Sequence, residues 1–212
     1  MMIGKFITFE GPDGSGKGTI IKYVKKYLIE NNIEFILTRE PGGINISEDI
    51  RKVILNKKNT SMDDRTEALL YAASRRQHLI EKVIPALKSG KIVICDRFVD
   101  SSLAYQGFAR GIGIDKVFEI NKFAIDNIMP DLTIFLDVLP EIGLDRINNS
   151  KVRVKDRLDL ESIEFHKRVY QGYMKVIEKY PSRIKVVDAE KSIKEVAKNT
   201  IIIIDEFLKN SN

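Results

Sequence analysis

Short runs of β-branched and aromatic residues alternate along the chain with longer stretches in which apolar residues recur every three or four positions. Such runs are typical of buried strands, and such periodic stretches are typical of amphipathic helices. The strongest strand patterns are KFITFE at residues 5–10 and KIVIC at residues 91–95. Shorter patterns predict three further strands, over residues 34–38, 132–137 and 184–188.

Helices are predicted between and after these strands, over residues 17–32, 47–55, 63–87, 116–127, 160–179 and 193–209. Ser47 is expected to cap the second helix at its N-terminus. Pro85 is expected to bend the third helix, and Gly90 is expected to end it. The isoleucine run 201–204 fits a strand as well as the last helix.

Strands separated by helices of this length predict an α/β fold of βαβ units, with a mostly parallel sheet flanked by helices. All 212 residues are expected to form a single domain. Ligands of such folds bind beyond the carboxyl ends of the strands, so the residues that follow each strand are the candidates for function.

Composition narrows the class of protein. The 35 Lys and Arg residues and the 30 Asp and Glu residues give a net charge of +5, which favours a solvated surface of mixed sign over a nucleic-acid partner. No apolar run reaches the roughly 18 residues that span a bilayer, and the first residues lack the order of a signal peptide. We therefore expect no membrane partner and a cytoplasmic location. One cysteine and two histidines exclude a disulfide framework and a transition-metal cluster.

The first predicted strand runs directly into a sequence that satisfies G-x-x-x-x-G-K and precedes a predicted helix. Its glycines let backbone N–H groups turn inward around an anion, and the helix N-terminus adds its dipole. Lys17 is expected to reach the β- and γ-phosphates of ATP. A glycine-rich turn with an incidental lysine is the alternative. The candidate nucleotide-binding residues are Gly11, Pro12, Asp13, Gly14, Ser15, Gly16, Lys17, Gly18 and Thr19.

The lysine is followed by Gly18, where such loops usually carry a Ser or Thr that binds Mg²⁺. The hydroxyl group of Thr19, one place later, is therefore expected to bind phosphate or a metal-bound water, and the direct ligands of the metal stay open. Contacts to adenine are expected at residues 187–189, after the last predicted strand.

Two further strands end in arginine. Residues 34–38 are followed by Arg39, and residues 91–95 by Asp96 and Arg97. Guanidinium groups bind phosphate in bidentate fashion, so two arginines at converging strand ends predict a second phosphate site, for an acceptor. Asp96 can hold a Mg²⁺-bound water or orient a nucleophile. Surface ion pairs are the alternative.

The predicted helix 63–87 carries Tyr71, Arg75 and His78 at helical spacing, on one face. An aromatic ring followed one turn later by an arginine can stack on a base and donate to its edge. A tyrosine on a helix more often serves ordinary packing, so this spacing alone leaves base binding open.

Four segments resemble the motifs of bacterial thymidylate kinases in order and spacing: FEGPDGSGK at 9–17, TREPGG at 38–43, SRR at 74–76 and DRFVDSSLAYQG at 96–107. The resemblance extends over essentially the whole chain. It implies the three-layer fold of P-loop nucleoside monophosphate kinases, transfer of the γ-phosphoryl group of ATP to dTMP in dTTP biosynthesis, Mg²⁺ as cofactor, and a homodimer.

The resemblance also implies which residues bind the acceptor phosphate and sugar. Arg39 and Arg97 match the arginines on the dTMP phosphate, with Arg51 as a helper. Asp96 would organise Mg²⁺ and this phosphate. Asp13 matches the acidic residue that contacts the 3′-hydroxyl group of the acceptor.

Further matches concern the base. Tyr71 occupies the position that stacks on thymine, and Arg75 matches the arginine that donates to O4. Ser102 and Gln106 match polar contacts to the base edge, and Tyr105 crowds the 2′ position of the sugar. The expected acceptor region covers about residues 39–107. The candidate dTMP-binding residues are Asp13, Arg39, Glu40, Arg51, Tyr71, Arg75, Arg97, Ser102, Tyr105 and Gln106.

Residues 148–159 alternate cations over a polar stretch and are predicted to form a lid. Phosphoryl transfer spreads negative charge over the moving group, and mobile arginines that close on it accelerate the reaction. The resemblance implies catalytic cations in the lid, because the phosphate loop lacks an arginine between Asp13 and Gly16. Arg153 and Arg157 match the lid positions, and a solvated loop is the alternative. The candidate catalytic residues are Lys17, Asp96, Arg97 and Arg153, with Arg153 as the transition-state cation.

Two rival functions stay open. Gly18-Thr19 also occurs in adenylate kinases, which favours another nucleoside monophosphate kinase, although residues 100–107 follow the thymidylate pattern. A nucleotide-binding regulatory ATPase has no small acceptor, so it needs neither two arginine-bearing strand ends nor a base-stacking helix. ADP release that depends on a monophosphate distinguishes a kinase from such an ATPase.

Overall fold

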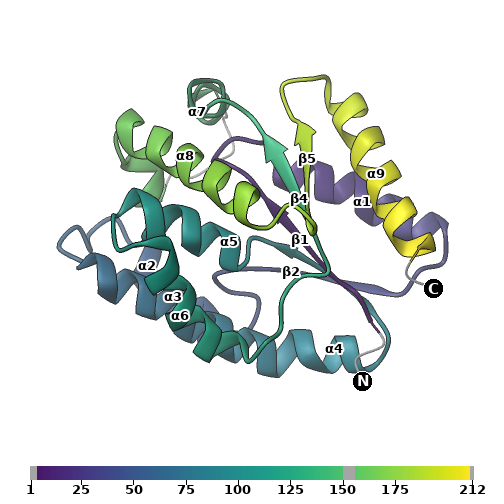
Figure 1. Ribbon diagram of the computed structural model, residues 1–212, viewed down its shortest axis with the longest axis horizontal. Helices are drawn as coiled ribbons and strands as arrows, with labels where there is room; N and C mark the ends of the chain where they lie inside the picture. Colours follow the sequence, from purple (N-terminus) through teal and green to yellow (C-terminus); the bar gives the residue numbers. More distant parts are fainter. Residues whose placement is uncertain (1–3, 150–155, 211–212) are drawn as a thin grey trace.

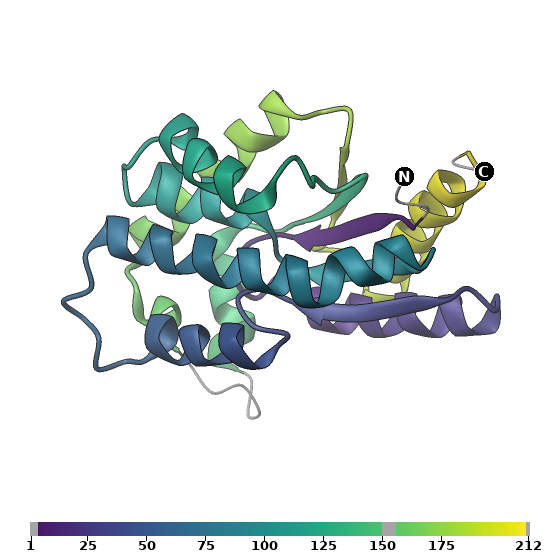
Figure 2. The same cartoon turned by 90° about the horizontal axis from the view of Figure 1, so that it is seen from below.

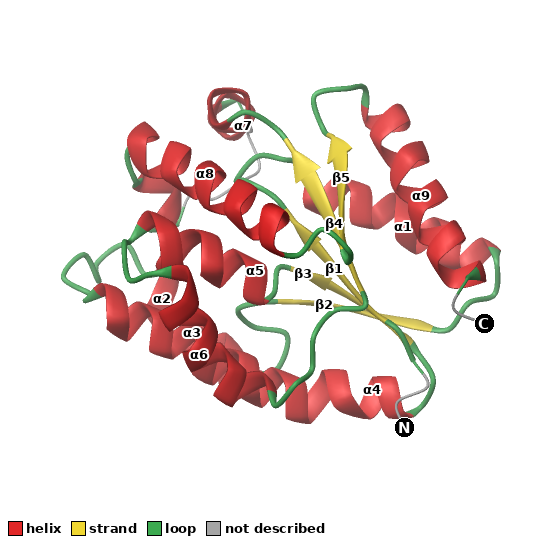
Figure 3. Ribbon diagram, in the orientation of Figure 1, coloured by secondary structure: helices red, strands yellow, loops and turns green. Residues whose placement is uncertain are grey.

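The computed structural model describes residues 4–149 and 156–210, and its centre is a parallel sheet (Figure 3). The strands lie in the order β2-β3-β1-β4-β5, and every neighbouring pair is parallel. Their bounds are β1 (Phe6–Glu10), β2 (Phe35–Arg39), β3 (Ile92–Asp96), β4 (Leu132–Asp137) and β5 (Ile184–Asp188). The predicted strands and the parallel sheet are thereby confirmed.

Helices cover both faces of the sheet (Figure 1). On one face α1 (Lys17–Glu30) packs beside α9 (Ile193–Lys209). The layer on the opposite face contains α3 (Asp64–His78), α4 (Ile84–Lys88), α5 (Val99–Ser102), α6 (Ile114–Ile125) and α8 (Ile163–Lys179). α2 (Asn45–Leu55) packs on α3 at the outside of this layer (Figure 2). α7 (Pro140–Asn148) follows β4. Within the described residues, no helix has the length and apolar character that crossing a bilayer requires.

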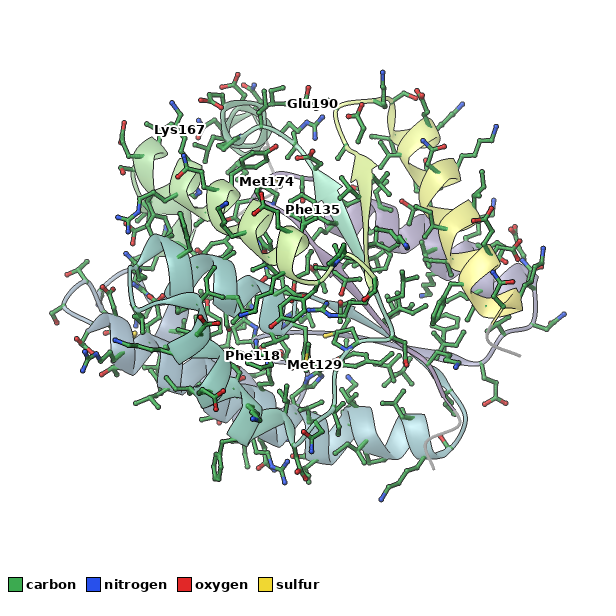
Figure 4. All side chains as sticks on the ribbon, viewed as in Figure 1. Phe118, Met129, Phe135, Lys167, Met174 and Glu190 are labelled. Atoms are coloured by element: carbon green, nitrogen blue, oxygen red, sulfur yellow. The ribbon has the colours of Figure 1, made fainter. Side chains whose placement is uncertain are left out.

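Alternate strand residues enter two separate hydrophobic cores. Ile7 and Phe9 of β1 belong to the core under α1 and α9. Phe6 belongs to the opposite core, where its ring meets that of Phe98 edge-on with centroids 4.9 Å apart. Figure 4 shows side chains filling the space between the layers, with Phe135 between β4 and α8. Burial of each large apolar side chain contributes about 1.5–3 kcal/mol, so these cores fix the helices on the sheet.

Most predicted helices are confirmed, with ends that differ by up to three residues. The isoleucine run 201–204 is helical, within α9. α8 begins at Ile163 because the side chain of Ser162 accepts a hydrogen bond from the N–H group of Phe165. The prediction that Ser47 caps α2 is wrong. The helix begins earlier, at Asn45, and Ser47 Oγ donates to the carbonyl oxygen of Ser74 at 2.8 Å.

The predicted helix 63–87 contains an interruption. After α3 the chain forms a π-helical segment, η1 (Leu79–Val83), in which the N–H group of Ile84 bonds to the carbonyl of Leu79, five residues back. Pro85 is the second residue of α4, directly after this segment, so the change in hydrogen bonding lies just before the proline, which has no N–H group to donate. A second π-helical segment, η2 (Leu103–Ala109), continues α5. This segment, α5 and α7 were not predicted.

A buried ion pair joins α5 to the residues before β5. Asp100 is 1% exposed, and its carboxylate accepts hydrogen bonds from Nη1 of Arg183 at 2.7 Å and from Nη2 at 2.6 Å. Asp100→Ala removes the carboxylate partner of a guanidinium group whose side chain is 12% exposed. We expect the free energy of unfolding, measured by urea denaturation, to fall by about 3 kcal/mol.

Asp49→Ala is the matched control for this variant. Its pair with Lys52 is exposed on both sides, at 72% and 77% of the side-chain area. Such surface pairs contribute little, so the free energy of unfolding should change by less than about 0.5 kcal/mol. Equal losses in the two variants would contradict a stabilising role for the buried pair.

Candidate active site

A cavity of about 1030 Å³ lies at the carboxyl ends of the strands. This volume is at the upper end of the roughly 300–1,000 Å³ of ligand pockets, so two small ligands can share it. The cavity brings together most of the predicted site residues, namely Asp13, Gly14, Ser15, Gly16, Lys17, Gly18, Thr19, Arg39, Glu40, Arg51, Tyr71, Arg75, Asp96, Arg97, Ser102, Tyr105 and Gln106.

The phosphate loop turns tightly between β1 and α1. Gly14 and Gly16 adopt φ angles of +78° and +89°, which favour glycine. A Cβ atom at Gly14 would also lie 2.0 Å from the carbonyl oxygen of Gly143, so no larger residue fits there. Gly16 precedes α1 and provides no side-chain cap, so the first N–H groups of the helix are left without a side-chain acceptor. Gly16 and the first residues of α1 line the cavity, which places the positive end of the helix dipole there.

Lys17 is hydrogen-bonded inside this loop. Its Nζ donates to the carbonyl oxygens of Gly11 at 3.0 Å and Pro12 at 3.4 Å, and to Ser15 Oγ at 3.4 Å. Burial, with a smaller contribution from Arg97, lowers the pKa of Lys17 to about 8, although three nearby carboxylates act in the opposite direction. An anion bound in the loop would favour the charged form of this lysine.

Arg97 connects the loop to the acceptor side of the cavity. Its backbone is left-handed, with φ +71°. Its Nη2 donates to Asp13 Oδ1 at 2.7 Å and to the hydroxyl of Tyr105 at 3.3 Å, and its Nη1 donates to Ser101 Oγ and to the hydroxyl of Tyr173. Burial alone would lower the pKa of Arg97, but the surrounding tyrosines and carboxylates raise it well above its usual value. The guanidinium group is therefore a fixed positive charge.

Glu10, the last residue of β1, lies beneath Arg97 and is buried. Its Oε2 accepts hydrogen bonds from Ser101 Oγ at 2.5 Å and from the hydroxyl of Tyr173 at 2.9 Å, the same two groups that Arg97 contacts. Burial and a neighbouring carboxylate raise the pKa of Glu10 to about 7, against the effect of Arg97. Glu10 thus orients the partners of Arg97. It was not predicted, although a glutamate that ends a buried strand is a recognisable signal.

The predicted convergence of two strand ends is confirmed, because Arg39 of β2 and Asp96 of β3 are register partners. Arg39 Nη2 bonds to Glu48 Oε1 at 2.8 Å, and Arg51 Nη1 donates to the carbonyl of Pro41 at 2.9 Å. Asp96 Oδ1 is buried and has no hydrogen-bond partner among the described residues. A buried carboxylate oxygen of this kind requires a water or a cation, so Asp96 fits the predicted Mg²⁺ site.

Arg75 is 1% exposed and lines the cavity beside Ser102. Its Nε donates to Glu40 Oε2 at 2.7 Å, and its Nη1 donates to Ser102 Oγ at 3.2 Å and to Asn121 Oδ1. No described residue accepts from its Nη2. Tyr71, one turn earlier on α3, lines the same cavity, and burial raises the pKa of its hydroxyl group. The predicted shared face of Tyr71 and Arg75 is confirmed.

The two predicted lid arginines differ in what the structure shows of them. Arg153 lies outside the described residues. Arg157 is 8% exposed and is not part of the cavity wall. Its Nε donates to the carbonyl of Ile54 at 2.8 Å, and its Nη2 bonds to Glu67 of α3. In this structure, therefore, a buried carboxylate holds Arg157 against α3, and its role in a lid stays a prediction.

The wall beyond the phosphate loop contains residues that follow β5. Of the predicted adenine segment 187–189, Ala189 lines the cavity, together with Lys191 and Ser192. Arg146 of α7 closes this side. Its Nη2 donates to the carbonyl of Ala189 at 3.0 Å, and its Nη1 to that of Gly14 at 3.5 Å. Arg146 was missed because α7 itself was not predicted.

Comparison with known proteins shows the family of the chain. The profile of the family described as "Thymidylate kinase" matches residues 9–200. A thymidylate kinase of Clostridium novyi (strain NT) is 67% identical over 193 residues, covering 91% of this chain and 94% of its own. One from Geobacillus sp. (strain WCH70) is 58% identical, covering 96% and 97%. The crystal structure of thymidylate kinase from Ehrlichia chaffeensis superposes with a TM-score of 0.76 at 35% identity, covering 95% of this chain and 98% of that chain. The chain therefore belongs to the thymidylate kinase family.

Proposed function

We propose that this chain transfers the γ-phosphoryl group of ATP to dTMP, giving dTDP and ADP, a step that supplies dTTP. The observation that carries the proposal is a single cavity that is lined by a phosphate loop, by Arg97 and by a buried Arg75. Family membership supports the same reaction. We expect the enzyme to act in the cytoplasm, where ATP and deoxynucleotides are used.

The residues of the cavity would carry the transfer by positioning and charge neutralisation. The N-terminus of α1 and Lys17 hold the β- and γ-phosphates, while Arg97 and Arg39 hold the phosphate of dTMP. An oxygen of that phosphate attacks the γ-phosphorus, the bond to the β,γ-bridging oxygen breaks, and ADP leaves with the electron pair. The attacking oxygen is already ionised, so no strong general base is required.

Mg²⁺ is the proposed cofactor, and Asp96 is the residue that would hold it, through its unpartnered Oδ1 or a bound water. The described residues contain no group of three or more metal-ligating side chains. Mg²⁺ typically keeps several waters and is held by one or two carboxylates and by substrate phosphates. When bound, the ion would neutralise part of the phosphate charge.

Thymine would lie against Tyr71, with Arg75 donating to O4 and with Gln106 and Ser102 at its polar edge. Tyr105 donates to Asp13 Oδ2 at 2.7 Å. These two side chains would therefore contact the sugar together, Asp13 at the 3′-hydroxyl group and Tyr105 beside the 2′ position. A base-directed site of this kind has no use in an ATPase that hydrolyses ATP without an acceptor.

We further propose a homodimer that forms through α3, η1 and α6. α3 and α6 pack against each other (Figure 1), and they expose large apolar side chains. Leu69 of α3 is 56% exposed, Ile80 of η1 is 46% exposed and Phe123 of α6 is 91% exposed. Large apolar side chains exposed on neighbouring elements are typical of protein–protein interfaces.

ADP release with ATP and Mg²⁺, measured with dTMP, dUMP, AMP and CMP in turn, tests the reaction. We expect release to depend on the acceptor and to favour dTMP. Lys17→Ala should lower kcat/KM by at least about 10²–10³-fold, because one donor to the transferring phosphates is lost. Release that is indifferent to every acceptor would leave an ATPase instead.

Arg153→Ala and Arg157→Ala separate the two lid arginines. If Arg153 stabilises the transition state, its removal should lower kcat by at least about 10³-fold with little effect on the KM for dTMP. Arg157→Ala should change kcat less than about tenfold. It should instead lower the free energy of unfolding by about 1–3 kcal/mol, because Glu67 loses a partner. The reverse pattern would make Arg157 the catalytic cation.

Phe123→Asp should convert the dimer to a monomer, because a carboxylate cannot be buried in an apolar interface without a partner. Light scattering after size-exclusion chromatography measures the mass. Ile29→Asp is the matched control, since Ile29 is 57% exposed on α1, away from α3 and α6. A wild-type chain that runs as a monomer, or a dimeric Phe123→Asp variant, would exclude this interface.

A further inference from the structure

Glu67 binds side chains from two distant parts of the chain. It lies in the first turn of α3 and is 1% exposed. Its Oε1 accepts from Gln106 Nε2 at 2.8 Å. Its Oε2 accepts from Arg110 Nη2 at 3.4 Å and from Arg157 Nη2. Gln106 and Arg110 belong to the segment around η2, and Arg157 belongs to the predicted lid segment, so three polar groups converge on one carboxylate.

The hydrogen bond from Gln106 fixes the orientation of its amide. A carboxylate paired with two guanidinium groups accepts hydrogen bonds and donates none. The amide must therefore turn its NH₂ group toward Glu67, which directs its carbonyl oxygen away. Oε1 of Gln106 accepts no hydrogen bond from any described residue, and Gln106 lines the cavity. Gln106 thus offers the cavity an acceptor.

Other contacts hold Glu67 in place. Arg110 also bonds to Glu161 Oε1 at 2.5 Å, and its Nε lies 3.3 Å from Asp64 Oδ1. Arg157 is anchored through its Nε to the carbonyl at the end of α2. Because the guanidinium groups of Arg110 and Arg157 are held by these other contacts, the carboxylate of Glu67 has one arrangement that satisfies every partner.

Arg75 supplies the second half of the recognition pattern. Glu67, Tyr71 and Arg75 are spaced by four residues, so they share one face of α3. A guanidinium group only donates, and Nη2 of Arg75 has no partner among the described residues. The cavity therefore presents a fixed donor from Arg75 and a fixed acceptor from Gln106. The matching base edge is a carbonyl beside an N–H group, as at O4 and N3 of a pyrimidine-2,4-dione.

We propose that Glu67 is a specificity-determining positioning residue, which excludes cytosine nucleotides by locking the amide of Gln106 with its oxygen toward the base. Cytosine presents an amino donor and a ring-nitrogen acceptor at these two positions, which reverses both hydrogen bonds. The inference rests on the proposed placement of the base against Arg75 and Gln106. It adds a residue that the base does not touch.

Glu67→Gln tests the proposal because an amide at 67 can donate as well as accept, which frees Gln106 to turn over. The measurement is kcat/KM for dTMP and for dCMP. We expect the ratio of the two to fall by roughly 10–100-fold, the effect of one mispaired buried hydrogen bond out of two. dTMP stays preferred, because Arg75 still opposes the amino group of cytosine.

Glu161→Gln is the control. It makes the same chemical change at another carboxylate bonded to Arg110 and does not touch Gln106. Its dTMP/dCMP ratio should stay within about threefold of wild type. An unchanged ratio in Glu67→Gln, or equal losses for the two acceptors, would show that Glu67 only stabilises the fold and would overturn the proposal.

The exchange variant Glu67→Gln/Gln106→Glu provides a second test, also where the single variant does not fold. A carboxylate at 106 accepts in either orientation, so the dTMP preference should return to within about tenfold of wild type. Loss of the preference in the folded exchange variant would overturn the proposal.

Gln106→Ala distinguishes a wrong placement of the base from a wrong role for Glu67. Unchanged kcat/KM for dTMP would refute the placement of the base itself, whereas a loss there with an unchanged ratio in Glu67→Gln would refute only the role of Glu67.

Discussion

The parallel register of β2, β3 and β1 is the constraint on which the active site depends. Asp96 is the register partner of Arg39 on one side and of Phe9 on the other. The phosphate loop, Arg39 and Asp96 therefore leave the sheet at the same edge, although Asp96 lies 86 residues after Glu10, the last residue of β1, in the sequence. Backbone hydrogen bonds and two hydrophobic cores fix this edge. The points at which these candidate phosphate-binding residues leave the sheet are thus set by the paired and buried strands.

Buried hydrogen bonds orient the side chains that follow the strand ends. Glu10 and Arg97 share Ser101 and Tyr173, and Asp13 bonds to both Arg97 and Tyr105. Hydrogen bonds between such groups are strong where water is excluded, and a fully paired network has few alternative arrangements. The charges that are proposed to bind phosphate are therefore oriented by the protein's own contacts, which is the condition for electrostatic catalysis.

Short-range patterns predicted the strands, the phosphate loop, and the shared face of Tyr71 and Arg75, because each depends on residues close in sequence. The convergence of Arg39 and Asp96 could be predicted because the carboxyl ends of neighbouring parallel strands lie at the same edge of the sheet. Arg157 shows where such reasoning stops. It follows a run of cations, but its position is decided by Glu67, ninety residues earlier. η2 is a π-helical turn and α7 has only nine residues, so neither was predicted, and the contacts of Gln106 with Glu67 and of Arg146 with Ala189 were missed with them.

Lys17 gives the phosphate loop an occupant of its own. Its ammonium group lies among the carbonyls of Gly11 and Pro12, so the loop keeps its shape through an internal counter-charge. If Lys17 binds the phosphates of ATP as proposed, nucleotide binding is an exchange, in which Lys17 gives up carbonyl oxygens and takes phosphate oxygens in their place. Each hydrogen bond gained would then replace one lost, which would moderate affinity. On departure of ADP the ammonium group would return to the carbonyl oxygens of Gly11 and Pro12, which are the contacts that the structure shows.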